Sequence, residues 1–201
     1  MSFLLWAALL AAPPAVNGEL LDVQRLIPDL VLDIRYATVD NVLGRPLYPV
    51  ARCLLRPQVA TRLATAADLL RQKGLRLRVF DCYRPLSIQR ALWKAHPHRG
   101  WVADPDHGGS NHNRGAAVDV SLATSSGGEV PMPTPYDAFS DRRARAAAED
   151  GVPAEARANR RTLQQAMEAA GFKTIRSEWW HFDGPRLPSD HCLDVPLQSV
   201  P

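Results

Sequence analysis

Two distant stretches of the chain carry residue types that could together bind a metal ion and activate water. The first holds His112 and Asp119, and the second holds Glu178 and His181. A catalytic zinc ion takes three protein ligands and keeps a fourth position for water. A neighbouring carboxylate that does not bind the ion can accept the water's proton. These residues therefore predict a hydrolase with one zinc ion on His112, Asp119 and His181, and with Glu178 as general base.

The backbone between His112 and Asp119 must turn and come back for both side chains to reach one ion. Gly115 and the two alanines after it would allow this turn and a close approach of the backbone. Asp119 stands between Val118 and Val120 in a β-type run. Because alternate side chains of a strand point to opposite faces, its carboxylate should face away from the valines.

Glu178 and His181 lie three residues apart, so they would not share one face of a strand. A bend or bulge is needed there, and the sequence itself shows none. Each stretch alone also fits a purely structural role. An Asp flanked by valines can cap a loop, and a His after two tryptophans can be a packed core residue. The two stretches together favour a site.

Arg84 is a further candidate, because it follows a predicted strand and directly precedes Pro85, which begins a predicted helix. It could donate a forked pair of hydrogen bonds to a carbonyl that becomes an oxyanion. Alternatively it is a surface or buried arginine paired with Asp81. Its position leaves both open. The histidines of the Gly- and Pro-rich loop over 96–109 lack strand or helix context, so we expect them to be loop residues: His96, His98 and His107.

The hydrophobic pattern predicts an α+β domain in which a small, mostly antiparallel sheet carries the site and helices pack on one side of it. Strands are predicted at 30–36, 75–80, 117–122 and 172–176, and helices at 57–74, 86–95 and 155–170. A hairpin turn is predicted at 124–129, with loops at 37–49 and 130–141.

Residues 1–17 are predicted to be a secretory signal peptide, because their apolar run has signal-peptide length and is followed by small and helix-breaking residues. The run is too short to span a membrane. The run lacks a preceding Lys or Arg, so a misplaced start is the alternative. Residues 18–201 would then be a single periplasmic or secreted domain, or a cytoplasmic one if the segment is not a signal. No later segment is expected to span a membrane, and the oligomeric state stays open.

The net charge of +3 and the pI near 9.0 are too mildly basic to indicate nucleic-acid binding. The chain has three cysteines, and none has a metal-type spacing. Cys53 precedes the first predicted helix and Cys82 follows the strand after it, so the two could meet. If the chain is exported, a Cys53–Cys82 disulfide with Cys192 free is expected.

Several runs of residues over about 30 to 183 form one pattern with the candidate site residues. They are Arg35-Tyr36-Ala37-Thr38, Asp81-Cys82-Tyr83-Arg84-Pro85, Ser110 to Asp119, Tyr136-Asp137 and Glu178-Trp179-Trp180-His181. In this order they resemble the VanX-type D-alanyl-D-alanine dipeptidases, a branch of the zinc peptidases that also include D,D-carboxypeptidases and the hedgehog domain. Cys82 departs from the pattern, because the family usually has Gly there.

The resemblance implies a hydrolase with one zinc ion per chain that cleaves D-Ala-D-Ala, with the ligands and base given above. It implies that Arg84 stabilises the tetrahedral intermediate, and that Tyr36, Ser110 and Asp137 hold the small D,D-dipeptide. Two alternatives stay open. One is a D,D- or L,D-carboxypeptidase acting on peptidoglycan stem peptides. The other is a non-catalytic zinc-stabilised binding domain, which would need neither Glu178 nor Arg84.

Overall fold

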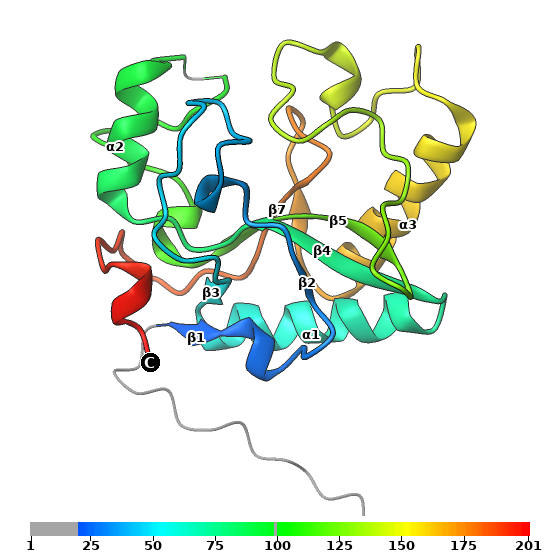
Figure 1. Cartoon of the computed structure of the whole chain (residues 1–201), viewed down its shortest axis with the longest axis horizontal. Helices are drawn as coiled ribbons and strands as arrows, with labels where there is room; N and C mark the ends of the chain where they lie inside the picture. Colours follow the sequence, from blue (N-terminus) through cyan, green and yellow to red (C-terminus); the bar gives the residue numbers. More distant parts are fainter. Residues whose placement is uncertain (1–19, 99) are drawn as a thin grey trace, which may run out of the picture.

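The computed structural model describes residues 20–98 and 100–201, and its centre is a five-stranded sheet in the order β2-β4-β5-β7-β6 (Figure 1). The first pair, β2 and β4, is parallel, and every other neighbouring pair is antiparallel. The strands are β2 (Val31–Leu32), β4 (Leu75–Asp81), β5 (Ala117–Thr124), β6 (Lys173–Thr174) and β7 (His181–Asp183). A separate antiparallel pair is formed by β1 (Leu21–Asp22) and β3 (Leu54–Leu55).

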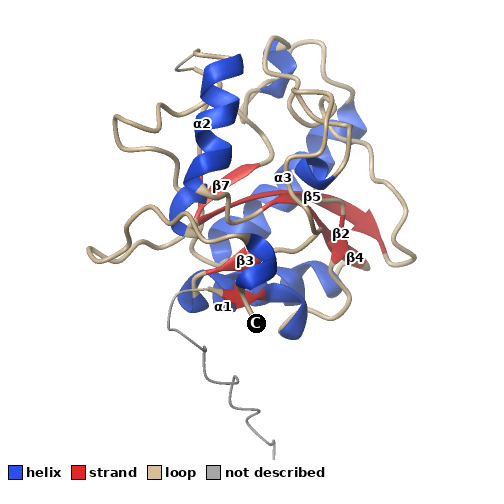
Figure 2. Ribbon diagram, turned by 60° about the vertical axis from the view of Figure 1, so that its left-hand side comes forward, coloured by secondary structure: helices blue, strands red, loops and turns tan. Residues whose placement is uncertain are grey.

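The three α-helices of the described residues lie on both sides of the large sheet. They are α1 (Pro57–Arg71), α2 (Leu86–Ala95) and α3 (Ala154–Ala169). Figures 1 and 2 both show α1 below the sheet and α2 above it, while α3 packs against α1. The expected packing on one side therefore holds for α1 and α3 but is wrong for α2. The described part of the chain also has five short 3-10 helices: η1 (Val23–Arg25), η2 (Arg35–Ala37), η3 (His112–Arg114), η4 (Arg142–Ala144) and η5 (Leu197–Ser199).

Helix α1 shows why the sequence pattern predicts its helices well. Pro57 occupies the first turn, where a missing N–H costs nothing. Val59, Leu63 and Leu70 recur at helical spacing and are fully buried. After the last turn, Gly74 adopts a left-handed φ of 70°, which ends the helix as expected.

The alternation along β5 separates the core from the site. Val118 and Val120 are fully buried in the hydrophobic core, and Asp119 between them points to the other face. This face is the one that carries the loops before and after β5. The prediction that Asp119 faces away from its valine neighbours is thus consistent with the fold.

The strand predicted over 30–36 is only partly right, because the ladder stops after β2. Asp33 still donates its N–H to the Val79 carbonyl oxygen at 2.9 Å. The chain then turns through η2, where the Arg35 guanidinium binds the carboxylates of Asp33 and Asp40. This turn directs the Tyr36 side chain toward the site. The strand predicted over 172–176 is likewise reduced to β6.

The expected disulfide is formed between Cys53 and Cys82, and Cys192 is free. The bridge joins the start of β3 to the end of β4.

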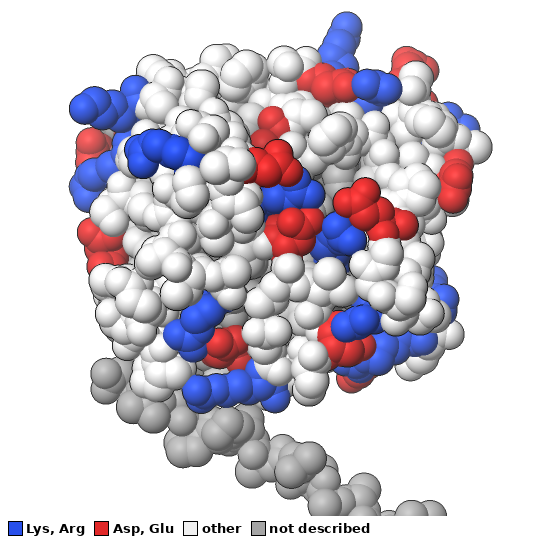
Figure 3. All heavy atoms as spheres, in the orientation of Figure 1, with Lys and Arg blue, Asp and Glu red and all other residues white. Residues whose placement is uncertain are grey.

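Acidic and basic side chains are interleaved on the face shown in Figure 3, without a large area of one sign. In the described part of the chain, no helix is long and apolar enough to cross a membrane. The predicted signal peptide, residues 1–17, lies outside the described residues.

Candidate active site

The register of the central strands aligns three polar residues side by side. In the ladder, Asp81 of β4 pairs with Asp119 of β5, and Asp119 pairs with His181 of β7. His112 arrives from η3, which ends at Gly115 in a left-handed turn with a φ of 63°. A Cβ at Gly115 would lie 2.6 Å from a Leu20 methyl carbon, so the expected turn with close backbone approach requires glycine.

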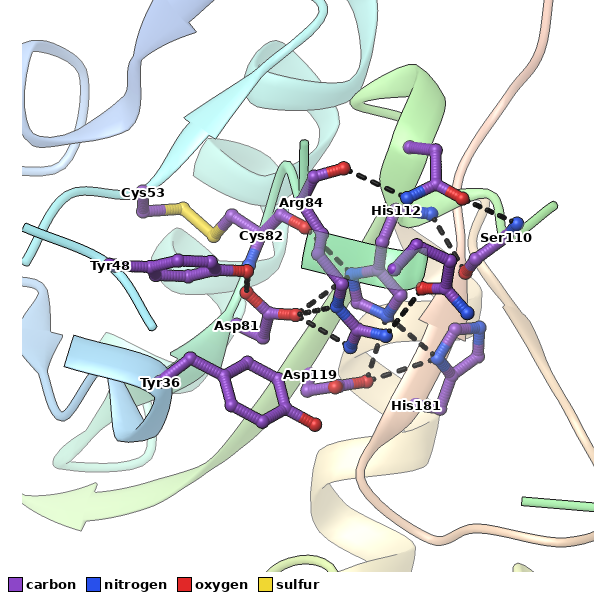
Figure 4. A network of polar contacts seen from close by, with 12 residues as sticks. Tyr36, Tyr48, Cys53, Asp81, Cys82, Arg84, Ser110, His112, Asp119 and His181 are labelled. Atoms are coloured by element: carbon purple, nitrogen blue, oxygen red, sulfur yellow. Dashed lines mark hydrogen bonds and ion pairs between the residues drawn. A yellow bond between two sulfur atoms is a disulfide. The ribbon is translucent and has the colours of Figure 1, made fainter. Parts of the chain in front are cut away.

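The donor atoms of His112, Asp119 and His181 converge on one point (Figure 4). His112 Nε2 lies 3.1 Å from His181 Nδ1 and 3.2 Å from Asp119 Oδ1, and the last two atoms are 3.0 Å apart. All three residues are buried, with exposed fractions of 2%, 3% and 8% in sequence order. The sequence therefore predicts this trio correctly as a group.

Each histidine has its other ring nitrogen fixed by an acceptor. His112 Nδ1 lies 2.7 Å from the Cys82 carbonyl oxygen, which can only accept, so this nitrogen carries the proton. His181 Nε2 lies 3.0 Å from Asp183 Oδ1 and donates to it in the same way. In the neutral ring, the nitrogen facing the trio then presents a lone pair, which is the tautomer that a metal ligand needs.

Asp119 is oriented through its second oxygen. Tyr136 donates its hydroxyl proton to Asp119 Oδ2 at 2.9 Å, which leaves Oδ1 facing the two imidazoles. Burial alone would raise the pKa of Asp119, but the charges and hydrogen bonds of His112 and His181 outweigh it and hold the pKa well below the ordinary value. The carboxylate is therefore ionised at neutral pH.

Burial opposes the charged form of His181, yet its hydrogen bonds to Asp119 and Asp183 dominate and raise its pKa to about 10.

The trio fits a small divalent cation by two measures. Ligand atoms bound tetrahedrally at about 2.0–2.1 Å lie about 3.3 Å apart, close to the 3.0–3.2 Å seen between these atoms. The donor set of two imidazoles and one carboxylate is also one that zinc commonly takes.

Arg84 is paired with Asp81, which is one of the two alternatives that its position left open. Its Nε and Nη2 donate to Asp81 Oδ2 at 2.9 and 2.7 Å, and its Nη1 donates to Gln89 Oε1 at 2.9 Å. It also lines the same cavity as the trio. A guanidinium has five N–H groups, so one on each Nη is left for a ligand. The Arg84 backbone N–H donates to the His112 carbonyl oxygen at 3.1 Å, which ties the two segments together.

Glu178 lines the cavity but stays outside the trio of converging donor atoms. The required bend lies between it and β7, since residues 179 and 180 are bent and Trp180 is anchored by its carbonyl to the Val120 N–H at 2.9 Å. Burial raises the pKa of Glu178 to about 7, and the Asp119 charge adds to this effect while His181 opposes it. A carboxylate with this pKa can exchange protons near neutral pH.

Tyr36, Ser110 and Asp137 also line this cavity. The Tyr36 hydroxyl donates to Asp137 Oδ2 at 3.2 Å, and Ser110 Oγ accepts the His112 N–H at 3.2 Å. Among the described residues, Asp137 is the only non-glycine residue with a positive φ, 58°. This strained backbone is typical of functional positions. Burial, followed by the charge of Asp119, raises the pKa of Asp137 well above its ordinary value.

The cavity is small, about 290 Å³, and two aromatic rings form part of its wall. Trp101 and Phe139 come from the loops before and after β5 and stack with centroids 5.9 Å apart at 13°. His98 stacks on Trp101 at 4.6 Å, so it belongs to the loop as expected. Trp101 is 39% exposed, which places it between the cavity and solvent.

Sequence reasoning missed the groups that support the trio. Asp183 and Tyr136 carry no role in the pattern of ligands and base, although both bind a residue of the trio directly. One signal for Asp183 is present, because it follows His181 by two residues and shares its strand face. Tyr136 gives no comparable signal, since it reaches Asp119 from a loop.

A match to a known family accompanies this geometry. The peptidase family described as D-ala-D-ala dipeptidase matches residues 16–197. The chain belongs to this family, and it is an enzyme of the peptidase class.

Curated relatives are similar over most of their length. The chain is 39% identical over 171 residues to the D-alanyl-D-alanine dipeptidase of Escherichia coli (strain K12), covering 85% of this chain and 87% of that protein. It is 33% identical over 174 residues to the D-alanyl-D-alanine dipeptidase of Enterococcus faecium, covering 75% and 83%. For the D-alanyl-D-alanine dipeptidase of Streptomyces coelicolor, it is 30% identical over 209 residues, covering 90% and 100%.

Proposed function

We propose that the protein hydrolyses the dipeptide D-Ala-D-Ala to D-alanine with one zinc ion held by His112, Asp119 and His181. The observation that carries this proposal is the convergence of three donor atoms at 3.0–3.2 Å, with both histidines in the ligand tautomer. Membership of the dipeptidase family supports the same substrate. When bound, the ion would supply a water of lowered pKa and positive charge near the scissile carbonyl.

The residues around the trio supply the other steps. Glu178, with a pKa of about 7, accepts the proton of the attacking water and later passes it to the leaving amine. Arg84 directs its two remaining N–H groups at the oxygen that gains negative charge. Because Asp81 and Gln89 hold the guanidinium in place, little reorganisation is needed as the charge develops.

Asp137 is suited to the ammonium group of the dipeptide. Burial and the charge of Asp119 raise the pKa of Asp137 more than Arg84 and Tyr36 lower it, and a substrate ammonium would stabilise the carboxylate form. Tyr36 positions the Asp137 carboxylate by its hydrogen bond, and Ser110 adds a hydroxyl to the wall. A cavity of about 290 Å³ has room for a dipeptide.

Hydrolysis assays on the purified, zinc-loaded protein test this function. D-Ala-D-Ala, L-Ala-L-Ala and a pentapeptide ending in D-Ala-D-Ala are compared, with release of D-alanine as the readout. We expect cleavage of the free D,D-dipeptide alone. Cleavage of the pentapeptide at a similar kcat/KM would indicate a carboxypeptidase instead, and no cleavage of any of the three with zinc bound would contradict the enzymatic assignment of the trio.

We also propose that the protein acts outside the cytoplasm. A disulfide whose cysteines are both buried, Cys53 at 0% and Cys82 at 1% exposure, is typical of proteins that fold in oxidising compartments. This supports the prediction that residues 1–17 are a signal peptide. Cell fractionation together with the intact mass of the native protein tests the proposal. An uncleaved chain found in the cytoplasm with three free thiols would contradict it.

A further inference from the structure

Asp183 is a carboxylate beside the trio to which the mechanism assigns no step. It lies on β7, two residues after His181, and it lines the cavity. Its Oδ1 accepts the His181 Nε2–H at 3.0 Å. His181 Nδ1 faces Asp119 and His112 on the other side of the ring. The ring is therefore held between the trio at one nitrogen and Asp183 at the other.

The contact with Asp183 decides which nitrogen of His181 carries the proton in the neutral ring. Without an acceptor at Nε2, the proton is free to occupy Nδ1, and a protonated Nδ1 has no lone pair for a metal ion. His112 meets the same need through the Cys82 carbonyl, a main-chain group that substitution does not remove. Asp183 is thus the one tautomer-fixing group of the two that a side-chain change can test.

The Asp183 carboxylate is itself held in position from a second segment. Asn111 donates from Nδ2 to the same Oδ1 at 2.8 Å. Asn111 directly precedes η3, which carries His112, and its own Oδ1 accepts from Arg186 Nη1 at 3.2 Å. Ala117 of β5 fixes the Asp183 backbone as its ladder partner. These contacts link the orientation of His181 to the segment that delivers His112.

We propose that Asp183 is a positioning residue that fixes the Nε2–H tautomer and the ring orientation of His181, and so sets the affinity of the trio for a divalent cation. The inference rests on the proposed function, because it takes the trio as the metal site. Acceptors of this kind are typically worth about 10–100-fold in metal affinity.

The test measures metal binding, independently of turnover, in the full protein. The dissociation constants of Zn²⁺ and Co²⁺ are obtained by competition with a chromogenic chelator for the wild type, Asp183→Ala and Asp183→Asn. We expect Asp183→Ala to raise the dissociation constants of both ions by about 10–100-fold. Asp183→Asn keeps an oxygen acceptor but loses the charge, so an intermediate loss is expected. The visible absorption of the Co²⁺ form should change in Asp183→Ala, because the His181 ring is released.

Two controls separate positioning from general damage. Glu178→Gln removes a negative charge from the same cavity without removing the acceptor at His181 Nε2, so its loss of Zn²⁺ affinity measures the effect of charge alone, and Asp183→Ala should lose more. Asp194→Ala removes a carboxylate that accepts the Ser87 N–H at 2.8 Å and lies outside the site, so its Zn²⁺ affinity should stay within about twofold of the wild type. Thermal unfolding of the metal-free variants identifies any that fail to fold, and Asp183→Asn then carries the test.

Wild-type Zn²⁺ affinity in both Asp183 variants, with an unchanged Co²⁺ spectrum, would overturn the inference while leaving the proposed function intact. A wild-type protein that binds neither ion would instead refute the proposed function. An affinity loss in Asp183→Ala that is equalled by Asp194→Ala would also overturn the inference, because the loss would then not be specific to the His181 contact.

Discussion

Removal of the Cys53–Cys82 disulfide should destabilise the protein by an amount that follows from the length of the loop it closes. The two cysteines are 29 residues apart in the sequence. In the chain-entropy description, opening a loop of this length returns about 12 cal/mol/K to the unfolded chain, or about 3.6 kcal/mol at 25 °C. For a chain of this size the corresponding fall in Tm is about 7–14 °C.

The contribution of the disulfide to the free energy of unfolding is measured most directly in the wild-type sequence. Equilibrium urea unfolding with and without a dithiol reductant gives the free energy of unfolding of the reduced and oxidised forms without deleting any atom. Both sulfurs lie in the core, so a Cys53→Ala and Cys82→Ala double variant should lose more, because it also leaves a small cavity. Cys192→Ser serves as the matched control, since Cys192 is free.

The reductant should lower the stability of the wild type and of Cys192→Ser equally, and it should have no effect on the double variant. A difference between reduced and oxidised wild type below about 1 kcal/mol would refute the loop-closure reasoning, because residual order in the unfolded chain would then dominate. An equal response of the double variant to reductant would show that the effect does not arise from this bridge.

Three further predictions concern the site. With Glu178 as base, kcat/KM should rise with pH through an apparent pKa of about 7, or through a lower pKa when a bound cation favours the carboxylate. Glu178→Gln should lose both the activity and this rise, and an unchanged rise would exclude Glu178 as its source. Arg84→Ala should lower kcat by about 10²–10³-fold, and it should lower the free energy of unfolding by about 3–5 kcal/mol because Asp81 stays buried without its charged partner. Arg84→Lys should restore more of the stability than of the rate. Near-normal turnover of Arg84→Ala would contradict its role. Because the pKa of metal-free His181 is about 10, Zn²⁺ binding at pH 7 should release about one proton. In calorimetry the binding heat should then depend on the ionisation enthalpy of the buffer, and heats that do not vary with the buffer would refute the protonated state.

Much of the fold could be predicted because local patterns determine it, and the trio could be predicted because its residue types are those of a metal site. The helical spacing and the flanking Pro57 and Gly74 define α1, and the alternation around Asp119 places its carboxylate on the correct face. The strand over 30–36 was wrong after Leu32 because its end depends on the ion pairs of Arg35 and on a loop that folds back, which alternation does not encode.

The site could be predicted only as far as the type and sequence position of single residues indicate their chemistry. The position of Arg84 leaves open whether it is an oxyanion donor or a partner of Asp81. The structure shows the pairing with Asp81 and places Arg84 in the cavity wall, and its role as an oxyanion donor stays a proposal. The support of the trio by Tyr136 and Asp183 depends on contacts between segments far apart in the chain. Such contacts become visible only when the strands are in register.

The stacked rings of Trp101 and Phe139 have a consequence for the speed of the enzyme. They belong to two different loops and line the wall of the cavity together, so a ligand that passes between these loops has to separate them, once on arrival and once as product leaves. If ligands take this route, turnover cannot exceed the rate at which the two rings separate. A viscous cosolvent would slow a reaction limited by such opening, and this dependence should weaken in Trp101→Ala.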